Sequence, residues 1–439
     1  MAEDLTEGLG EPLAAPGPSR ANRPDAGDRG ISSPAARSVG EIEAQLGYLW
    51  AEDAAGRARV AQLQADLARA RAQAATRAAA IAAAEPAASD ERHVAARSSV
   101  LNLIVVAGRP ETAERCAAVI AATAGHQPSR SLILSAEDPD GPAGLEARVH
   151  ARFQPAPSGP AQTVAETVRI LARGETGRHL ASIIVPLLVH DLRVALWWPD
   201  DPQLTSHRAE RLLPLADQLI VDGMSWSGDG LGRLLALAQV AAPGRLLVTD
   251  FALLRQARWR EALASVYDLP DLRPHLRGVR SITIEFAAGA SEPVSSTNLV
   301  RPVYHVAWLA SRLGMSVVSP LGRARAGTRT ATLRQRDHAV KVELRPVDSG
   351  LGPGSTVRIQ VASSRRGSEL EGIVSAGDDT VEVEVLEMGR QRIRRVFPAP
   401  RLNEVDLLER AIEDGPSDLL AAGTLAMAAR IIGPELPAA

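Results

Sequence analysis

The sequence predicts an α/β fold: a Rossmann-like or related domain with a parallel or mixed sheet, followed by a smaller antiparallel β domain with C-terminal helices. Between residues 98 and 320, apolar runs of strand length alternate with amphipathic helical segments, as in parallel sheets covered by helices. Short runs of alternating apolar and polar residues follow within 321–439, which is typical of an antiparallel sheet with one solvated face. Helical segments near 403–413 and 416–431 close the chain.

Two segments precede these domains. Residues 1–37 are rich in Pro, Gly, Ala and Asp and lack an apolar period, so we expect a disordered tail that buries too little apolar surface to offset ordering entropy. The region 38–97 is expected to be an N-terminal helix and an Ala- and Arg-rich helical insertion, either solvated or facing a partner. Ser38 and Glu41 form a capping-box pattern at the start of this helix. Apolar residues then recur at helical spacing: Ile42, Leu46 and Leu49.

Within 98–320 the expected elements follow in order. "VLNLIVVAG" predicts a buried strand that ends at Gly108, and a helix to about Ala124 precedes the strand "SRSLILSA". The next segments are expected as strand "QTVAETVRIL", helix "RHLASIIVPLL", strand "LRVALWW", helix "HRAERLLPLA", strand "DQLIVDG", helix "LGRLLALAQVA" and a weaker strand "RLLVTD". The long helix "FALLRQARWREALASVY", the strand "VRSITIEFA" and the helix "LVRPVYHVAWLASRLG" complete the domain.

Composition excludes several classes of function. A formal net charge of -3 gives no excess of either sign to recruit nucleic acid or an anionic membrane. Lys341 is the only lysine and follows no glycine loop, which argues against a Walker-type phosphate loop or a Schiff-base enzyme. Cys116 is the only cysteine, so no disulfide within the chain and no thiolate zinc cluster can form, and we expect a cytoplasmic protein. We expect no targeting signal and no membrane span, because the longest apolar stretch, "ASIIVPLLV", is too short to cross about 30 Å of hydrocarbon.

Three features of the sequence could form a functional site, but each also has a structural explanation. The turn at Gly108 offers free N–H groups to a phosphate, but it has one glycine where the dinucleotide fingerprint needs three, so we expect no cofactor. His179, His190 and Asp191 lie close in sequence, yet they lack a metal-ligand spacing, and a capping or hydrogen-bonded structural role is preferred over acid–base work. The basic segment 322–336 has no interleaved aromatic residues and is interpreted as an interdomain linker without nucleic-acid binding. No catalytic or metal-binding residue is expected.

The double tryptophan in "VALWWPDDP" is unusual in a chain with only six tryptophans. Neighbouring residues of a strand point to opposite faces, so Trp197 and Trp198 are expected in different layers. Either both pack against helices, or one belongs to a recognition surface, where tryptophan often contributes most binding energy. We expect Trp198 to face a partner, because it adjoins Pro199 and Asp200, where the chain leaves the sheet.

The segments "EIEAQLGYLW", "VLNLIVV", "HQPSRSLIL", "RHLASIIVPLLVHDLRVALWWPDDP", "ADQLIVDGMSW", "RWREALA" and "AWLASRLG" occur in an order that resembles the OpcA family of glucose-6-phosphate dehydrogenase assembly proteins. The resemblance covers about residues 39–50 and 98–320, and its most specific part runs from Arg178 to Pro199. It implies a non-catalytic assembly factor or allosteric activator of glucose-6-phosphate dehydrogenase that supports the oxidative pentose phosphate pathway. We expect the partner-binding residues to include Arg178, His179, Trp197, Trp198, Pro199 and Asp200.

This chain departs from the family pattern in its 51–97 insertion and in lacking the cysteines proposed for thiol control in some cyanobacterial relatives. The alternative from another class is a sugar-phosphate or nucleotide-binding enzyme that uses a crevice near Trp198. His179 and Asp191 would be its acid–base pair.

Overall fold

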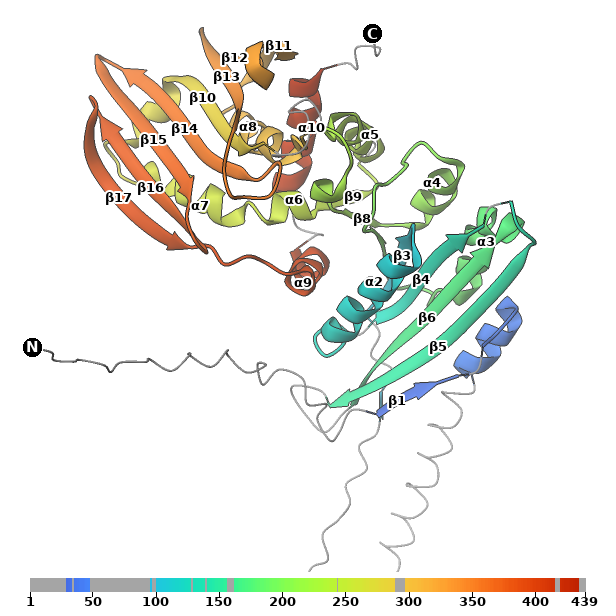
Figure 1. Ribbon diagram of the computed structural model, residues 1–439. Helices are drawn as coiled ribbons and strands as arrows, with labels where there is room; N and C mark the ends of the chain where they lie inside the picture. Colours follow the sequence, from blue (N-terminus) through green and yellow to red (C-terminus); the bar gives the residue numbers. More distant parts are fainter. Residues whose placement is uncertain are drawn as a thin grey trace, which may run out of the picture.

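The computed structural model describes residues 29–47, 95–96 and 100–433, apart from positions 34, 128, 139, 156–161, 243, 289–296 and 415–418. These residues form two sheets with helices around and between them (Figure 1). Most of the predicted tail and of the Ala- and Arg-rich insertion lies outside the described residues.

The first sheet contains nine strands and has a parallel core. The core strands, in spatial order, are β6 (Gln162–Arg173), β4 (Ser129–Glu137), β3 (Leu101–Ala107), β7 (Val194–Trp198), β8 (Gln218–Val221) and β9 (Leu247–Asp250). Taken along the chain, this is the 3-2-1-4-5-6 order of a Rossmann sheet. The order reverses between β3 and β7, so a crevice is expected at the carboxyl ends of these two strands. The predicted Rossmann-like fold is therefore confirmed.

One edge of this sheet is extended by strands that the sequence patterns do not reveal. β5 (Gly144–Pro155) runs antiparallel to β6, β1 (Arg29–Ser32) runs antiparallel to β5, and β2 (Ala95–Ala96) pairs with β6. Ala36 is fully buried and bridges Ala147. The prediction of a disordered segment through residue 37 is wrong for β1 and Ala36, because pairing with the long β5 supplies order that local composition lacks.

The predicted helix after this strand is confirmed, with residues 39–47 helical. The Ser38 hydroxyl accepts a hydrogen bond from the Glu41 backbone N–H at 3.2 Å, and the Glu41 carboxylate accepts one from the Arg37 N–H at 2.7 Å. Ile42 and Leu46 are buried in the core. The capping residues thus start the helix where its apolar side meets the sheet.

Helices cover both faces of the first sheet. One face carries α2 (Pro110–Thr123) and α9 (Glu404–Asp414), and the other carries α3 (Leu180–Ile184), α4 (His207–Leu212) and α5 (Leu231–Ala241). Figure 1 shows the chain leaving β17 and reaching α9, and α9 contacts α2. A helix from the end of the chain therefore completes the first sheet's core.

The second sheet has eight strands, and all neighbouring pairs are antiparallel except β10 with β13. In spatial order the strands are β11 (Ser316–Arg323), β12 (Arg329–Gln335), β13 (His338–Val347), β10 (Val279–Ala287), β14 (Thr356–Arg365), β15 (Ser368–Ala376), β16 (Thr380–Glu387) and β17 (Arg390–Pro398). On β13, Val340, Val342 and Leu344 are fully buried, while the residues between them point outward. The predicted antiparallel sheet with one solvated face is present.

The boundary between the sheets differs from the predicted one at 320. Strands of the first sheet end at Asp250, and β10 lies inside the second sheet beside β13 and β14. The expected long helix from Phe251 is two helices, α6 (Phe251–Leu254) and α7 (Ala257–Val266). A local pattern identifies β10 as a buried strand but cannot tell which sheet it joins.

The remaining helices connect the two parts. α8 (Val300–Arg312) contacts β10 and β13, and α10 (Leu419–Ile432) contacts both α8 and α5. The two C-terminal helices were expected from sequence, but α9 and α10 each contact elements of the first part of the chain, so they are not confined to a β domain.

Candidate functional site

The carboxylate of Asp200 lies at the N-terminus of α2, beyond the carboxyl ends of β3 and β7. Its Oδ2 accepts a hydrogen bond from the Gly108 backbone N–H at 2.8 Å, and its Oδ1 accepts one from the Thr112 hydroxyl at 3.0 Å. The Arg109 guanidinium lies 3.7 Å from Oδ1. Dinucleotide-binding Rossmann proteins place the pyrophosphate at this helix end. In this chain, a carboxylate of the protein itself meets the free N–H group and the positive end of the helix dipole.

The single glycine of this turn has a defined role. A Cβ atom at position 108 would lie 3.2 Å from Asp200 Oδ2. This spacing is tighter than ordinary van der Waals contact, so a larger residue would press on the carboxylate. The absence of a side chain at Gly108 therefore leaves room for the Asp200 carboxylate. The three-glycine fingerprint that lets a pyrophosphate approach the backbone is missing.

A hollow of about 450 Å³ opens beside this cap. Three residues that the sequence predicts for the site line it: Arg178, Trp198 and Asp200. Gly108, Gly177 and Arg208 also contribute to its lining. Burial lowers the pKa of Arg208 below its ordinary value. The structure thus brings half of the predicted partner-binding residues together in one concave place.

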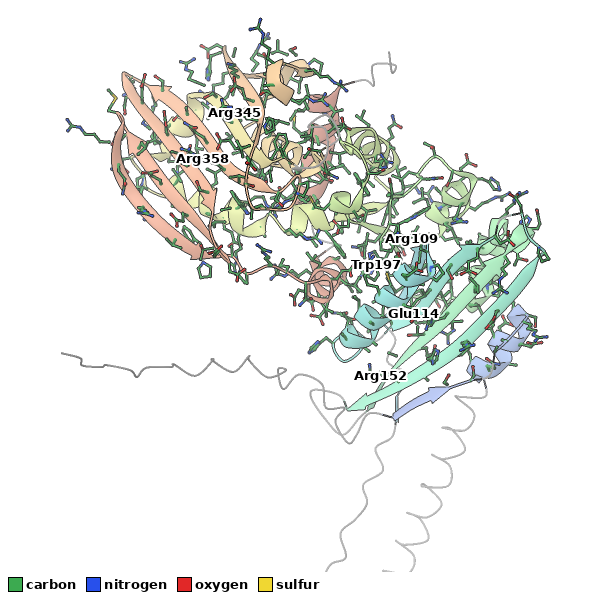
Figure 2. The ribbon with its side chains drawn as sticks, in the orientation of Figure 1. Arg109, Glu114, Arg152, Trp197, Arg345 and Arg358 are labelled. Carbon is green, nitrogen blue, oxygen red and sulfur yellow. The ribbon has the colours of Figure 1, made fainter. Side chains whose placement is uncertain are left out.

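The tryptophan pair lies on opposite faces of β7, as the strand period predicts. Trp197 is fully buried with Phe251, whose ring centroid is 6.1 Å away, in the layer that α2 and α9 cover (Figure 2). Trp198 is 5% exposed and packs in the opposite layer. Little of the Trp198 side chain is exposed, although it contributes to the wall of the hollow, and Pro199 is buried as well. That Trp198 faces a partner stays a prediction.

Arg178 and His179 are exposed and share one carboxylate. The Arg178 guanidinium lies 3.3 Å from Glu175 Oε2, and His179 Nε2 lies 3.3 Å from Glu175 Oε1. These side chains follow the carboxyl end of β6, on the edge of the sheet where the hollow opens. They are the predicted residues most available to a partner.

The alternative acid–base pair is not brought together. His179 follows the end of β6, whereas Asp191 precedes the start of β7, and these two strands run parallel within one sheet. The two side chains therefore belong to opposite edges of the sheet. No hydrogen bond or ion pair joins them within the described residues.

A buried carboxylate that sequence reasoning missed lies at the end of β9. Asp250 accepts hydrogen bonds from the backbone N–H groups of Gly223 at 2.9 Å and Ala252 at 2.8 Å, and from the Tyr304 hydroxyl at 2.9 Å. Burial raises its pKa from 3.8 to about 7. Asp250 thereby ties β9 and α6 to α8. The only signal in the sequence is an aspartate at the end of a short strand.

The described part of the chain contains no group of three or more His, Cys, Asp or Glu side chains arranged to hold a metal ion. Among the same residues, no helix combines the length and apolar character needed to cross a membrane.

The fold and the site define a class of protein: a Rossmann-type α/β protein with a second, mostly antiparallel sheet, in which a carboxylate of the chain itself bonds to the turn after the first core strand. Two family models match the chain, and both describe a glucose-6-phosphate dehydrogenase subunit. The model of its N-terminal domain matches residues 120–239, and the model of its C-terminal domain matches residues 247–421. Together they cover more than half of the chain, which belongs to this OpcA family of glucose-6-phosphate dehydrogenase subunits. The family resemblance noted in the sequence is confirmed.

One curated relative matches a limited part of the chain at low sequence identity. The putative OxPP cycle protein OpcA of Synechocystis sp. is 26% identical over 154 residues, which are 35% of this chain and 30% of that protein. The chain thus matches less than a third of the length of this curated relative.

Among solved structures, a levoglucosan dehydrogenase in complex with NADH and L-sorbose is 12% identical, with a TM-score of 0.42, over 76% of this chain and 95% of that one. The WlbA dehydrogenase of Thermus thermophilus in complex with NAD and UDP-GlcNAcA is 13% identical, with a TM-score of 0.39, over 76% of this chain and 96% of that one.

Proposed function

We propose that this protein is a non-catalytic assembly factor or allosteric activator of glucose-6-phosphate dehydrogenase and supports the oxidative pentose phosphate pathway. Both matched family models describe a subunit of that enzyme, and the name of the Synechocystis relative refers to the OxPP cycle.

The main support for a non-catalytic role is the hydrogen bond that the Gly108 N–H donates to Asp200. A nucleotide phosphate in the usual Rossmann position would meet the Asp200 carboxylate, and two anions at one helix end repel each other. The separation of His179 from Asp191 removes the candidate acid–base pair. Both findings favour a binding role over turnover.

For the contact with the dehydrogenase we propose the rim of the hollow, with Arg178 and His179 as the outward side chains and Asp200 at the wall. Trp197, Trp198 and Pro199 are buried, so their part in binding is to fix the strand end that carries Asp200. The rim belongs to the region that the N-terminal family model covers.

The test is to mix the purified protein with glucose-6-phosphate dehydrogenase of the same host, and to measure binding and the rate of NADP reduction. The protein should bind and raise the enzyme's activity while showing no turnover alone. Arg178→Glu should weaken binding by about tenfold, because reversing a rim charge opposes a complementary partner surface.

Arg148→Glu is the matched control. Arg148 is 61% exposed and 3.4 Å from Glu146, whereas Arg178 is 60% exposed and 3.3 Å from Glu175. Equal effects of both reversals would place the contact surface away from Arg178.

A further inference from the structure

A second cavity, of about 440 Å³, lies away from the Asp200 hollow. Its walls come from α6 and α7, the first turn of α8, α9, and the segments before β14 and β16. Figure 1 shows α9 close to α6, at the place where the chain returns from β17. The volume falls within the range of small-molecule sites.

The lining is strongly cationic. It contains one carboxylate, Asp379, and five arginines: Arg255, Arg258, Arg301, Arg401 and Arg410. Two of these have acidic partners: Arg255 forms a two-pronged contact with Asp222, and Arg258 lies 2.6 Å from Glu261. Arg301, Arg401 and Arg410 have no ion-pair partner within 4.0 Å in the part of the chain that the structure describes. Within the described residues, Arg401 and Arg410 are therefore unpaired around the cavity, and Arg301 has only the nearby charge of Asp222, beyond ion-pair distance.

Arg301 is the most constrained of the three. Its Nε atom is buried and has no hydrogen-bond partner among the described residues. Burial and the neighbouring Arg255 lower the pKa of Arg301 to about 10, so the guanidinium is still charged at neutral pH. Arg301 is partly buried, and a guanidinium withdrawn from water without an ion pair is costly, so an anion in the cavity would lower that cost.

The lining also contains the hydroxyl-bearing residues Ser355, Thr356 and Thr380. The Thr356 hydroxyl lies 3.0 Å from Nε2 of His305, whose pKa is held well below its ordinary value by burial and by Arg301. His305 is therefore neutral and adds no charge. Arginines and hydroxyl groups around one cavity suit a ligand that has an anionic group and several polar oxygens.

We propose that this cavity binds a small phosphorylated metabolite of sugar-phosphate size, with its phosphate on Arg301, Arg401 and Arg410 and its hydroxyls towards Ser355 and Thr356. Guanidinium groups match phosphate oxygens in pairs. The inference does not rest on the proposed function, because the ligand would bind to this chain alone.

The proposal is tested by isothermal titration calorimetry of the full chain with glucose 6-phosphate, ribose 5-phosphate and inorganic phosphate. Glucose and ribose, which lack the phosphate, are the matched controls. A sugar phosphate should bind with a Kd below about 1 mM, more tightly than inorganic phosphate, and the free sugars should not bind. Arg301→Gln should weaken binding by at least about tenfold, because it removes a charge-assisted hydrogen bond.

Since Arg301 is partly buried and its replacement could disturb the fold, the double variant Arg401→Gln/Arg410→Gln serves as the second test and should weaken binding similarly. Arg258→Gln, a lining arginine that already has an acidic partner, should leave the Kd within about twofold. The proposal is overturned if no sugar phosphate binds, if free sugars bind equally well, or if the double variant binds like the wild type. Tighter binding of inorganic phosphate than of either sugar phosphate would also contradict it.

Discussion

The backbone N–H of Gly108 donates a hydrogen bond to the carboxylate of Asp200, 92 positions later in the chain, at 2.8 Å. This contact joins the ends of β3 and β7, the two strands at which the Rossmann order reverses. α2 has no capping side chain of its own at Arg109, so Asp200 supplies the cap from another strand. The Asp200 carboxylate therefore stabilises the start of α2 and occupies the position that a phosphate takes in dinucleotide-binding Rossmann proteins.

Replacement of Asp200 tests this cap. Asp200→Ala should lower the free energy of unfolding by about 0.5–2 kcal/mol, because α2 loses its acceptor. Asp200→Asn should cost less, since its amide oxygen can still accept from Gly108. Urea denaturation measures both, and an alanine variant as stable as the wild type would contradict the capping role.

The buried tryptophan pair gives a second prediction. Trp197→Ala and Trp198→Ala should each destabilise the protein by about 3–5 kcal/mol, because each leaves a cavity in a packed layer. Trp197→Phe should cost less, since the indole Nε1 has no hydrogen-bond partner among the described residues. If Trp198→Ala has normal stability but loses dehydrogenase binding, Trp198 belongs to the recognition surface.

Asp250 predicts a pH dependence of stability. Burial raises its pKa from 3.8 to about 7, so between these pH values the folded protein binds a proton that the unfolded chain has released. The stability that depends on protonated Asp250 is complete below about pH 4 and is lost as pH rises to 7. Relative to Asp250→Asn, the wild type should lose on the order of 2 kcal/mol between pH 5 and 7.

The asparagine is a matched control because its amide oxygen can accept from Gly223 and Ala252 as Asp250 does, and its amide nitrogen can donate to the Tyr304 oxygen in place of the bond that Tyr304 donates to Asp250. Denaturation of both proteins across this pH range gives the difference. A constant difference would mean that Asp250 does not titrate there.

Cys116 should be chemically inert in the folded protein. It is fully buried, and burial raises the pKa of its thiol to about 12, so the reactive thiolate is scarce at neutral pH. Labelling with a thiol reagent should require unfolding, and Cys116→Ala should keep any stimulation of the dehydrogenase in reducing and oxidising buffer alike. Rapid labelling of native protein, or an oxidation response that the variant loses, would show thiol control.

The sequence predicts the core strands and both C-terminal helices because their apolar periods are local properties. It does not predict that Val279–Ala287 joins the second sheet, or that α9 crosses to cover Trp197, because both depend on pairing and packing between distant segments. The sequence does not predict β1 either, because this strand depends on its pairing with the distant β5. At the site, the tryptophan pair and Asp200 stand out in sequence, but the cap on Gly108 becomes visible only when β3 and β7 lie side by side.

The proposed role is tested by comparing NADP reduction by glucose-6-phosphate dehydrogenase with and without this protein, alongside this protein alone with the same substrates. We expect a complex of the two proteins, a higher rate of NADP reduction in the mixture and no turnover by this chain alone. Nucleotide-dependent turnover by the purified chain, or the absence of any complex and any change in rate, would contradict it.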